Sequence, residues 1–250
     1  MASDKNRDIV ANYDAVARLS PLDVLSSGRY ASSAFGYAGK LGRFLVKEME
    51  LTPADRVLDA GCNVGIYHKT VAANVFRLIG IDASSAAIER ARQAQRGIPN
   101  IEYRAADLTT LSPADFPERF DKILCYSVVH FLGDMQEFET LLKTFVGLLK
   151  GGHGMVFLGE VRETEMYEAY QQQLKTNGGS RWRNLKFSLL KKVQRWLLRG
   201  VKVREGIAPT LFHRAEIEAL AARLGAKCER IEQESWHPFY NTCVDYRLRF

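Results

Sequence analysis

A nine-residue stretch, VLDAGCNVG at positions 57–65, constrains the fold of this chain more than any other feature of its sequence. It joins a short apolar run to a glycine turn and then to a helical pattern. A strand–turn–helix unit of this kind brings bare backbone close to a nucleotide-like ligand at the start of the helix. Gly61 and Gly65 permit that approach, since a Cβ atom would intrude. The same spacing also occurs in ordinary tight turns, so its meaning depends on the residues that follow.

Two acidic residues follow at the ends of the next two predicted strands. The strand predicted at 76–82 ends in Asp82, and the strand predicted at 101–105 is followed by Asp107. The carboxyl ends of parallel strands meet at one edge of a sheet, where a carboxylate can accept two hydrogen bonds from ribose hydroxyls. We therefore expect a nucleotide-like ligand at this edge, held by the glycine turn and both acids.

Short apolar runs alternate with helical patterns from about residue 56, which is typical of a parallel sheet wrapped by helices. The remaining strands are predicted at 56–60, 121–126, 153–158, 227–234 and 242–250. Helices are predicted up to residue 74 and over 84–95, 135–149 and 212–224. The predicted fold class is α/β, a Rossmann-like, seven-stranded, mostly parallel sheet with helices on both faces. It carries an N-terminal helical layer and a helical cap insertion in addition.

The alternating pattern also divides the chain into regions. Residues 1–50 are interpreted as an N-terminal helical lid, and residues 51–160 with 208–250 as the core that binds the ligand. The alternation lapses between them, so residues 161–207 are interpreted as a basic helical cap inserted over the ligand edge. At this length one elaborated domain is favoured over two independent ones.

Five segments follow one another in a recognisable order: VLDAGCNVG, IGIDAS, AADL, FDKILCYSVVHFL and LLKGGHGMVFLGE. In this order they resemble the motifs of class I S-adenosylmethionine-dependent methyltransferases, in style those of the broad small-molecule group. The resemblance implies S-adenosyl-L-methionine as cofactor and S-adenosyl-L-homocysteine as product. Asn63 stands where the family usually has glycine, but asparagine tolerates a positive φ better than other side chains. The Gly-x-Gly-x-x-Gly pattern of nicotinamide enzymes is interrupted at Cys62 and Asn63.

The resemblance also implies roles for individual residues. In such enzymes the positions of Asp59 and Gly61 serve the methionine end of the cofactor, that of Asp82 serves the ribose, and those of Asp107 and Leu108 serve the adenine. The further cofactor-binding residues expected here are Cys62, Asn63, Gly65, Ala83, Cys125, Tyr126 and Tyr13. Tyr13 is interpreted as closing over the cofactor, with a core tyrosine of the N-terminal layer as the equal alternative.

Methyl transfer from a sulfonium is an in-line displacement, in which positioning and the removal of water do much of the work. An alcohol or phenol acceptor also benefits from a general base. His130, after the fourth strand, and His237, after the sixth, are the candidate catalytic residues, each with an ordering role in its loop as the alternative. His68 and His153 are assigned to the framework or the surface.

The sixth strand is expected to run parallel to the core strands, so the loop after it faces the active site. The residues predicted to bind the acceptor are Glu160, Trp236, Tyr240 and Asn241. Residues 125–128 lack the Asn/Asp-Pro-Pro-Tyr/Phe turn that is typical of amine-methylating enzymes. The Pro-Cys nucleophile of cytosine-C5 methyltransferases is also absent from the sequence. The missing amine-type turn and the available histidines favour oxygen over nitrogen as the methylated atom, in a small or medium acceptor of the sugar, glycan or natural-product type.

Two other functions stay open. One is methylation of RNA or another nucleic acid with the same cofactor. The other is a cofactor-binding protein without catalysis that acts as a membrane-associated partner.

The positive charge is concentrated in one segment. The formal net charge is +6, and residues 181–204 hold nine Lys and Arg with no Asp or Glu, which leaves −3 for the rest. Three interpretations are open: a cap helix with solvated cations, an amphipathic helix on an anionic membrane surface, or the approach for an anionic or lipid-linked acceptor. Nucleic acid is disfavoured, since no RNA-binding module accompanies the basic segment.

The four cysteines, Cys62, Cys125, Cys228 and Cys243, are far apart and form no C-x-x-C pair. This spacing argues against a zinc site and a disulfide framework and fits a reducing compartment. No apolar signal core begins the chain, and no run of about 18 apolar residues occurs. We expect a cytoplasmic protein without a metal ion, with peripheral contact at the inner membrane surface as a further option.

Overall fold

The sheet has seven strands, in a computed structural model that describes residues 4–19, 36–176 and 209–250. The strand order is β3-β2-β1-β4-β5-β7-β6. The strands are β1 (Arg56–Ala60), β2 (Arg77–Asp82), β3 (Ile101–Ala105), β4 (Lys122–Tyr126), β5 (Met155–Val161), β6 (Lys227–Glu232) and β7 (Val244–Arg249). Strands β1 to β5 pair in parallel, and β7 is antiparallel to both β5 and β6. The predicted fold class is confirmed, and β6 runs parallel to the core strands as expected.

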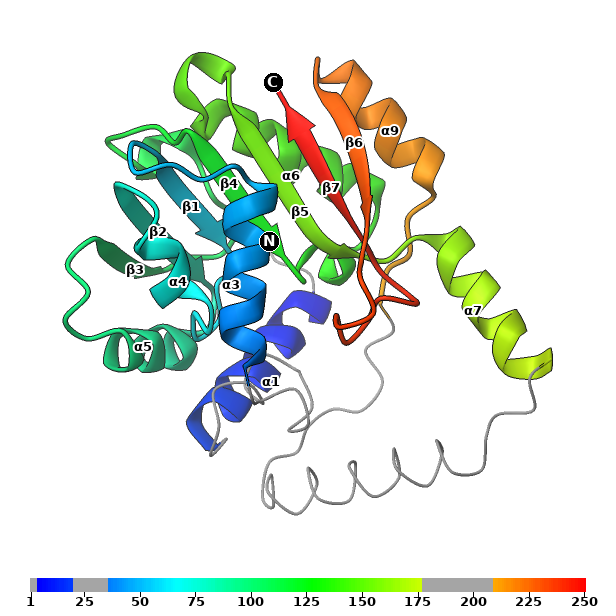
Figure 1. The fold of residues 1–250 in the computed structure, drawn as a ribbon, viewed down its shortest axis with the longest axis horizontal. Helices are drawn as coiled ribbons and strands as arrows, with labels where there is room; N and C mark the ends of the chain where they lie inside the picture. The colour runs from blue at the N-terminus through cyan, green and yellow to red at the C-terminus, as the bar shows by residue number, and fades with distance from the viewer. Residues whose placement is uncertain (1–3, 20–35, 177–208) are drawn as a thin grey trace.

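Helices cover both faces of this sheet (Figure 1). Those of the described residues are α1 (Asp4–Leu19), α3 (Tyr37–Glu48), α4 (His68–Ala72), α5 (Ser85–Ala94), α6 (Met135–Leu148), α7 (Thr164–Thr176) and α9 (Arg214–Arg223). Buried residues of α3 and α4 pack with one face of the strands, and those of α6 and α9 pack with the other. Helix α5 begins at an N-cap, Ser84, whose side chain accepts a hydrogen bond from the Ala87 amide.

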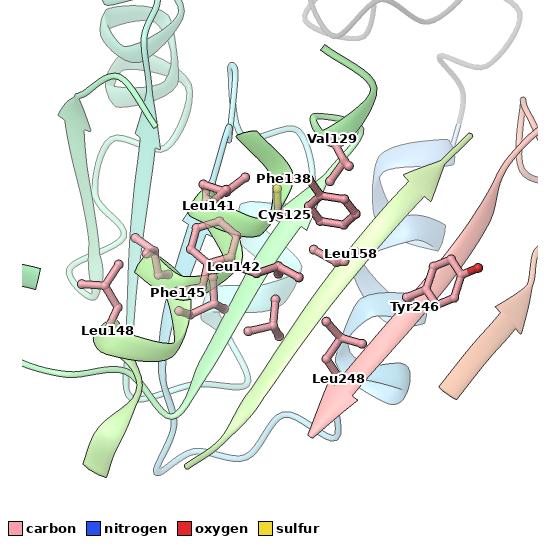
Figure 2. Close-up of a cluster of buried hydrophobic side chains, with 14 of the residues drawn as sticks. Cys125, Val129, Phe138, Leu141, Leu142, Phe145, Leu148, Leu158, Tyr246 and Leu248 are labelled. Atoms are coloured by element: carbon pink, nitrogen blue, oxygen red, sulfur yellow. The ribbon is translucent and has the colours of Figure 1, made fainter. Parts of the chain in front are cut away.

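Strand β4 shows why the central strands are apolar along their whole length. Successive side chains of a strand point to opposite faces. Leu124 and Tyr126 therefore pack in the layer of α3 and α4, while Cys125 packs against α6. Figure 2 shows Cys125 in the α6 layer, beside Phe138 and Leu158. Because helices cover both faces, neither face of the strand can be polar without a partner.

Strand β5 differs most from its prediction. It was predicted over 153–158 and is observed at Met155–Val161. Its pairing with β7 shifts register between Leu158 and Val161, and within the irregularity Glu160 adopts a φ of 54°. The pairing carries the strand past the Gly159–Glu160 position at which the apolar run stops, so Glu160 lies inside the strand.

The proposed division into lid, core and cap stays a prediction. Of the N-terminal region, α3 packs on the sheet through Leu41 and Leu45, and α1 packs against α5. Of the predicted cap, α7 is described, whereas the basic segment 181–204 lies outside the described residues. No helix among the described ranges is long and apolar enough to span a membrane.

Candidate active site

A pocket opens at the carboxyl ends of β1, β2 and β4, the edge predicted for the ligand. Its walls come from α1, the turn after β1, the ends of β2 and β3, and the segment after β4. The lining residues are Ile9, Val10, Tyr13, Gly61, Cys62, Asn63, Val64, Gly65, Ile66, Tyr67, Asp82, Ala83, Asp107, Leu108, Thr109, Tyr126, Ser127, Val128, Phe131 and Leu132. The structure thus brings together ten of the twelve residues predicted to bind the cofactor.

The turn after β1 takes its shape from three left-handed residues. Gly61, Asn63 and Gly65 have φ values of 88°, 48° and 62°. The expectation that Asn63 can replace a glycine here is therefore confirmed. At Gly61 the need for glycine is also steric, since a Cβ atom would lie 2.3 Å from Cγ2 of Val128 on the facing wall of the pocket.

Gly65 has a second, steric purpose in addition to the predicted one. A Cβ atom there would lie 2.6 Å from Nδ1 of His68 and 2.8 Å from Oη of Tyr103. Both of these side chains belong to the protein interior. Although Gly65 also lines the pocket, its missing side chain makes room for packing beneath the turn.

Asp82 ties the glycine turn to the start of α5. Its Oδ2 accepts a hydrogen bond from the Asn63 amide at 2.8 Å, and its Oδ1 accepts one from the Ser84 amide at 2.9 Å. Burial raises the pKa of the Asp82 carboxyl, and the charge of Asp59 adds to the rise, while the two amides oppose it. Each carboxylate oxygen can accept a second hydrogen bond, so Asp82 keeps accepting capacity for a ligand hydroxyl.

Asp59 does not line the pocket but lies fully buried directly beneath the turn. Its Oδ2 accepts hydrogen bonds from Tyr67 Oη at 2.8 Å and His68 Nε2 at 2.6 Å. Its other oxygen, Oδ1, has no hydrogen-bond partner among the described residues. A buried carboxylate with one unmatched oxygen indicates a site that a donor group of a ligand completes.

Of the two cysteines predicted to bind the cofactor, the structure places only one in the pocket. Cys62 lines the pocket, whereas the Cys125 side chain lies in the apolar layer under α6 (Figure 2). Cys125 was expected among the cofactor residues, and the alternation along β4 instead presents its neighbour Tyr126 to the pocket. Burial raises the pKa of both thiols, so both stay protonated.

Neither predicted catalytic histidine lines the pocket. His130 is 8% exposed in a short 3-10 turn, and its neighbours Val128 and Phe131 form the wall instead. His237, 1% exposed, places Nδ1 3.2 Å from the hydroxyl of Tyr126, which does line the pocket. His237 thus reaches the pocket through Tyr126. The catalytic roles of both histidines stay predictions.

The four residues predicted to bind the acceptor do not line this pocket either. Glu160 is buried, and its amide donates to Asp245 Oδ1 at 2.8 Å. Burial raises the pKa of the Asp245 carboxyl to about 7. Trp236 packs against the ring of Phe44 on α3, and Tyr240 and Asn241 are exposed in the β6–β7 loop. Their acceptor roles stay predictions.

Sequence reasoning missed ten of the lining residues: Ile9, Val10, Val64, Ile66, Tyr67, Thr109, Ser127, Val128, Phe131 and Leu132. Those at 127–132 directly follow the fourth strand, and their position at the carboxyl edge was a usable signal. Ile9 and Val10 stand four and three residues before Tyr13 on α1, so the predicted place of Tyr13 over the cofactor was a usable signal for them as well. Among the described residues, no group of three or more His, Cys, Asp or Glu could hold a metal ion.

Comparison with known proteins agrees with this geometry. A family model described as a methyltransferase domain matches residues 58–157. The ubiquinone biosynthesis O-methyltransferase of Brucella melitensis is 30% identical over 199 residues, which cover 77% of this chain and 71% of that protein. This chain belongs to the class I S-adenosylmethionine-dependent methyltransferases. Its cofactor is S-adenosyl-L-methionine, which supplies an electrophilic methyl group and leaves as S-adenosyl-L-homocysteine.

A further relative and a solved structure are also similar to this methyltransferase. Nodulation protein S of Rhizobium tropici is 27% identical over 121 residues, which cover 48% of this chain and 49% of that protein. The solved complex of DhpI with SAM and HEP covers 100% of both chains with a TM-score of 0.60 and 15% identity. At that identity the likeness concerns the fold.

The pocket has the features that this cofactor needs. The glycine turn exposes backbone, Asp82 keeps accepting capacity beside it, and Asp59 Oδ1 is buried without a partner among the described residues. Tyr13 of α1 contributes an aromatic wall, with its ring 5.6 Å from that of Phe131. The donors and the charge of the cofactor match these acceptors.

Helix α1 is fastened beside the pocket by Asp14. Its Oδ1 accepts hydrogen bonds from Ser84 Oγ at 2.9 Å and from the Ala86 amide at 3.0 Å, at the N-terminus of α5. These hydrogen bonds and the Arg18 guanidinium hold the pKa of Asp14 below its usual value, against the effect of burial. A carboxylate at a helix N-terminus is also stabilised by the helix dipole.

Replacing Asp14 by alanine should release α1 from α5. We expect S-adenosyl-L-homocysteine to bind about 5- to 10-fold more weakly, since a hydrogen bond to a charged group contributes roughly 1.5 kcal/mol. Because the folded-state pKa is lowered, the fastening is present above the unfolded pKa and is lost as the pH falls through the folded value. Calorimetry with S-adenosyl-L-homocysteine and limited proteolysis at the N-terminus measure both effects. Unchanged affinity and unchanged proteolysis would show that Asp14 does not hold α1.

Proposed function

We propose that this methyltransferase methylates an oxygen atom of a small or medium acceptor of the sugar, glycan or natural-product type, and that the nine cations in the sequence of segment 181–204 favour an anionic or lipid-linked acceptor. The observation that carries the oxygen assignment is the pair formed by Tyr126 and His237. A phenol in the pocket wall is backed by a buried imidazole at 3.2 Å. An oxygen acceptor must lose its proton during the transfer, and such a pair can receive it. The similarity to an O-methyltransferase of ubiquinone biosynthesis supports the same assignment.

The proposed role of Tyr126 is to pass a proton from the acceptor to His237. The acceptor O–H proton moves to Tyr126 Oη, while the Tyr126 proton moves to His237 Nδ1, which is neutral at the start. When bound, S-adenosyl-L-methionine would supply the methyl group, whose bond to sulfur breaks as its bond to the acceptor oxygen forms. His237 would hold the released proton and return it through Tyr126 Oη to the pocket and solvent once the products leave. Tyr126 keeps its place because its ring packs directly over Gly159, where a Cβ atom would lie 1.9 Å from Cδ2.

The cofactor roles follow the layout of the pocket. Asp82, at the end of β2, would accept hydrogen bonds from the ribose hydroxyls. Asp107 and Leu108, after β3, would hold the adenine. Asp59 and Gly61, at the end of β1, would serve the methionine end, and Asp59 Oδ1 supports this because it is buried without a partner among the described residues.

Incubation with labelled S-adenosyl-L-methionine and a cell extract tests the assignment, followed by identification of the labelled product. We expect the label in an O-methyl group of a small molecule, glycan or lipid-linked saccharide. Label in an N-methyl or C-methyl group would contradict the oxygen assignment. Label in material that ribonuclease destroys would favour the nucleic-acid alternative.

With the acceptor in hand, Tyr126→Phe tests the proton path. It removes one hydroxyl and keeps the ring that packs over Gly159. We expect kcat to fall by about 10²-fold, the usual effect of losing general base catalysis, with S-adenosyl-L-homocysteine affinity nearly unchanged. Tyr170→Phe on α7, outside the lining of the pocket, is the matched control. Equal rates for the two variants would remove Tyr126 from the mechanism.

A further inference from the structure

A chain of buried hydrogen bonds runs beneath the glycine turn from β1 to β3. His68, the first residue of α4, places Nε2 2.6 Å from Asp59 Oδ2 and Nδ1 2.7 Å from Tyr103 Oη. Asp59 and His68 are fully buried, and Tyr103 is 7% exposed. The rings of His68 and Tyr103 stack at 5.4 Å with an interplanar angle of 18°. The sequence assigned His68 only to the framework or the surface.

The chemistry of the three groups sets the direction of this chain. A carboxylate only accepts, so His68 Nε2–H donates to Asp59. In a neutral ring Nδ1 then accepts, and the donor is the hydroxyl of Tyr103. Burial raises the pKa of Tyr103, and the neighbouring Cys62 and Asp59 add to the rise, so its hydroxyl keeps the proton that it donates. The Cys62 thiol also stays protonated because burial raises its pKa.

This chain of hydrogen bonds leaves one carboxylate oxygen of Asp59 available to another donor. Both donors, Tyr67 Oη and His68 Nε2, reach Oδ2. Oδ1 is buried and has no partner among the described residues. Two hydrogen bonds to Oδ2 fix the orientation of the Asp59 carboxylate, so its other oxygen also keeps a defined position.

The surrounding packing leaves the two rings no freedom to move. A Cβ atom at Gly65 would meet Nδ1 of His68 at 2.6 Å. At Gly80 of β2, a Cβ atom would lie 3.0 Å from His68 Cε1 and 3.0 Å from Tyr103 Cδ1. The glycine turn above and the strand beside the rings therefore both depend on glycine, and the rings stay aligned with Asp59.

We propose that His68 and Tyr103 are positioning residues for the cofactor: they hold the Asp59 carboxylate in place, with Oδ1 left to accept from the ammonium group at the methionine end of S-adenosyl-L-methionine. This inference rests on the proposed role of Asp59 and is independent of the acceptor. It adds to the cofactor site two residues that do not line the pocket. It also connects β3, which precedes Asp107, to the carboxylate at the end of β1.

Calorimetry with two ligands tests the proposal. S-adenosyl-L-homocysteine carries the ammonium group, whereas 5′-methylthioadenosine lacks the whole amino-acid part. We expect His68→Leu to weaken S-adenosyl-L-homocysteine by at least ~10-fold and 5′-methylthioadenosine by less than about 2-fold, because only the former carries the amino-acid part that Asp59 is proposed to serve. His68→Gln should recover most of the loss, since its amide can still donate to Asp59. His153→Gln, at an exposed position before β5, is the matched control.

Equal weakening of both ligands by His68→Leu, without recovery in His68→Gln, would reduce the role of His68 to structural support and overturn the proposal. Asp59→Asn distinguishes the proposed role of Asp59 from the positioning role of His68. If Asp59→Asn leaves the affinity for S-adenosyl-L-homocysteine unchanged, the proposed role of Asp59 fails. If Asp59→Asn weakens it and His68→Leu does not, the positioning role alone fails.

Tyr103→Phe keeps the proposal testable if His68→Leu does not fold. It removes a single hydroxyl and keeps the stacked ring. We expect it to weaken S-adenosyl-L-homocysteine by about 3-fold, with 5′-methylthioadenosine unchanged, because one neutral hydrogen bond behind His68 is lost. Identical affinities in wild type and Tyr103→Phe would exclude Tyr103 from the chain.

Discussion

Replacing Asp82 by alanine should weaken the binding of S-adenosyl-L-homocysteine by about 1–3 kcal/mol, which is roughly 5- to 150-fold. The loss has two sources. The ribose hydroxyls lose their acceptor, and the amides of Asn63 and Ser84 lose the carboxylate that joins the glycine turn to α5. Isothermal titration calorimetry measures the change directly.

A matched control for this variant lies on α6. Asp134 also accepts two backbone amides, those of Gln136 and Glu137, each at 2.9 Å, but it caps a helix outside the pocket lining. Asp134→Ala should cost about 1 kcal/mol of stability and leave the affinity unchanged. If Asp82→Ala loses no more affinity than Asp134→Ala, Asp82 does not hold the cofactor.

Replacing Gly65 by alanine should destabilise the protein by about 2–5 kcal/mol. A side chain at a φ of 62° costs roughly 1–2 kcal/mol, and overpacking of a filled interior costs a further 1–3 kcal/mol. The new Cβ atom meets His68 and Tyr103, which are held by stacking and hydrogen bonds and cannot swing away. Denaturant unfolding measures the loss of stability.

Gly97→Ala separates the two contributions. Gly97 has a φ of 91°, and a Cβ atom there would meet nothing within 4 Å. It should therefore cost only the roughly 1–2 kcal/mol of the left-handed backbone. Equal losses in the two variants would show that the His68 and Tyr103 rings yield to the extra methyl group. In that case the packing beneath the turn is softer than the contacts indicate.

The sequence was most informative where chemistry and chain position coincide. The glycine turn, Asp82 and Asp107 each follow a strand, and the parallel sheet brings the ends of these strands to one edge. The left-handed backbone of Asn63 was likewise predictable, because few side chains other than asparagine tolerate it. These predictions needed only local patterns and the direction of the strands.

Predictions were less accurate where they depended on the face of a strand or turn to which a side chain points. Cys125 and Tyr126 are adjacent, yet one points to α6 and the other to the pocket. His130 stands in a stretch most of which lines the pocket, and the 3-10 turn presents Val128 and Phe131 instead. A shift of one residue along a strand or turn reverses the facing, and sequence patterns locate elements less precisely than that.

The sequence by itself determined the sheet and the acidic residues at the ligand edge, because periodicity and strand-end position are local properties of the chain, and its resemblance to class I methyltransferases supplied the cofactor class. Only the tertiary structure decided which side chains act together. Tyr126 meets His237 across 111 residues of sequence, and Tyr103 meets His68 across 35. Such pairs depend on how loops and helices dock onto the sheet, and that docking is set by packing of the whole chain.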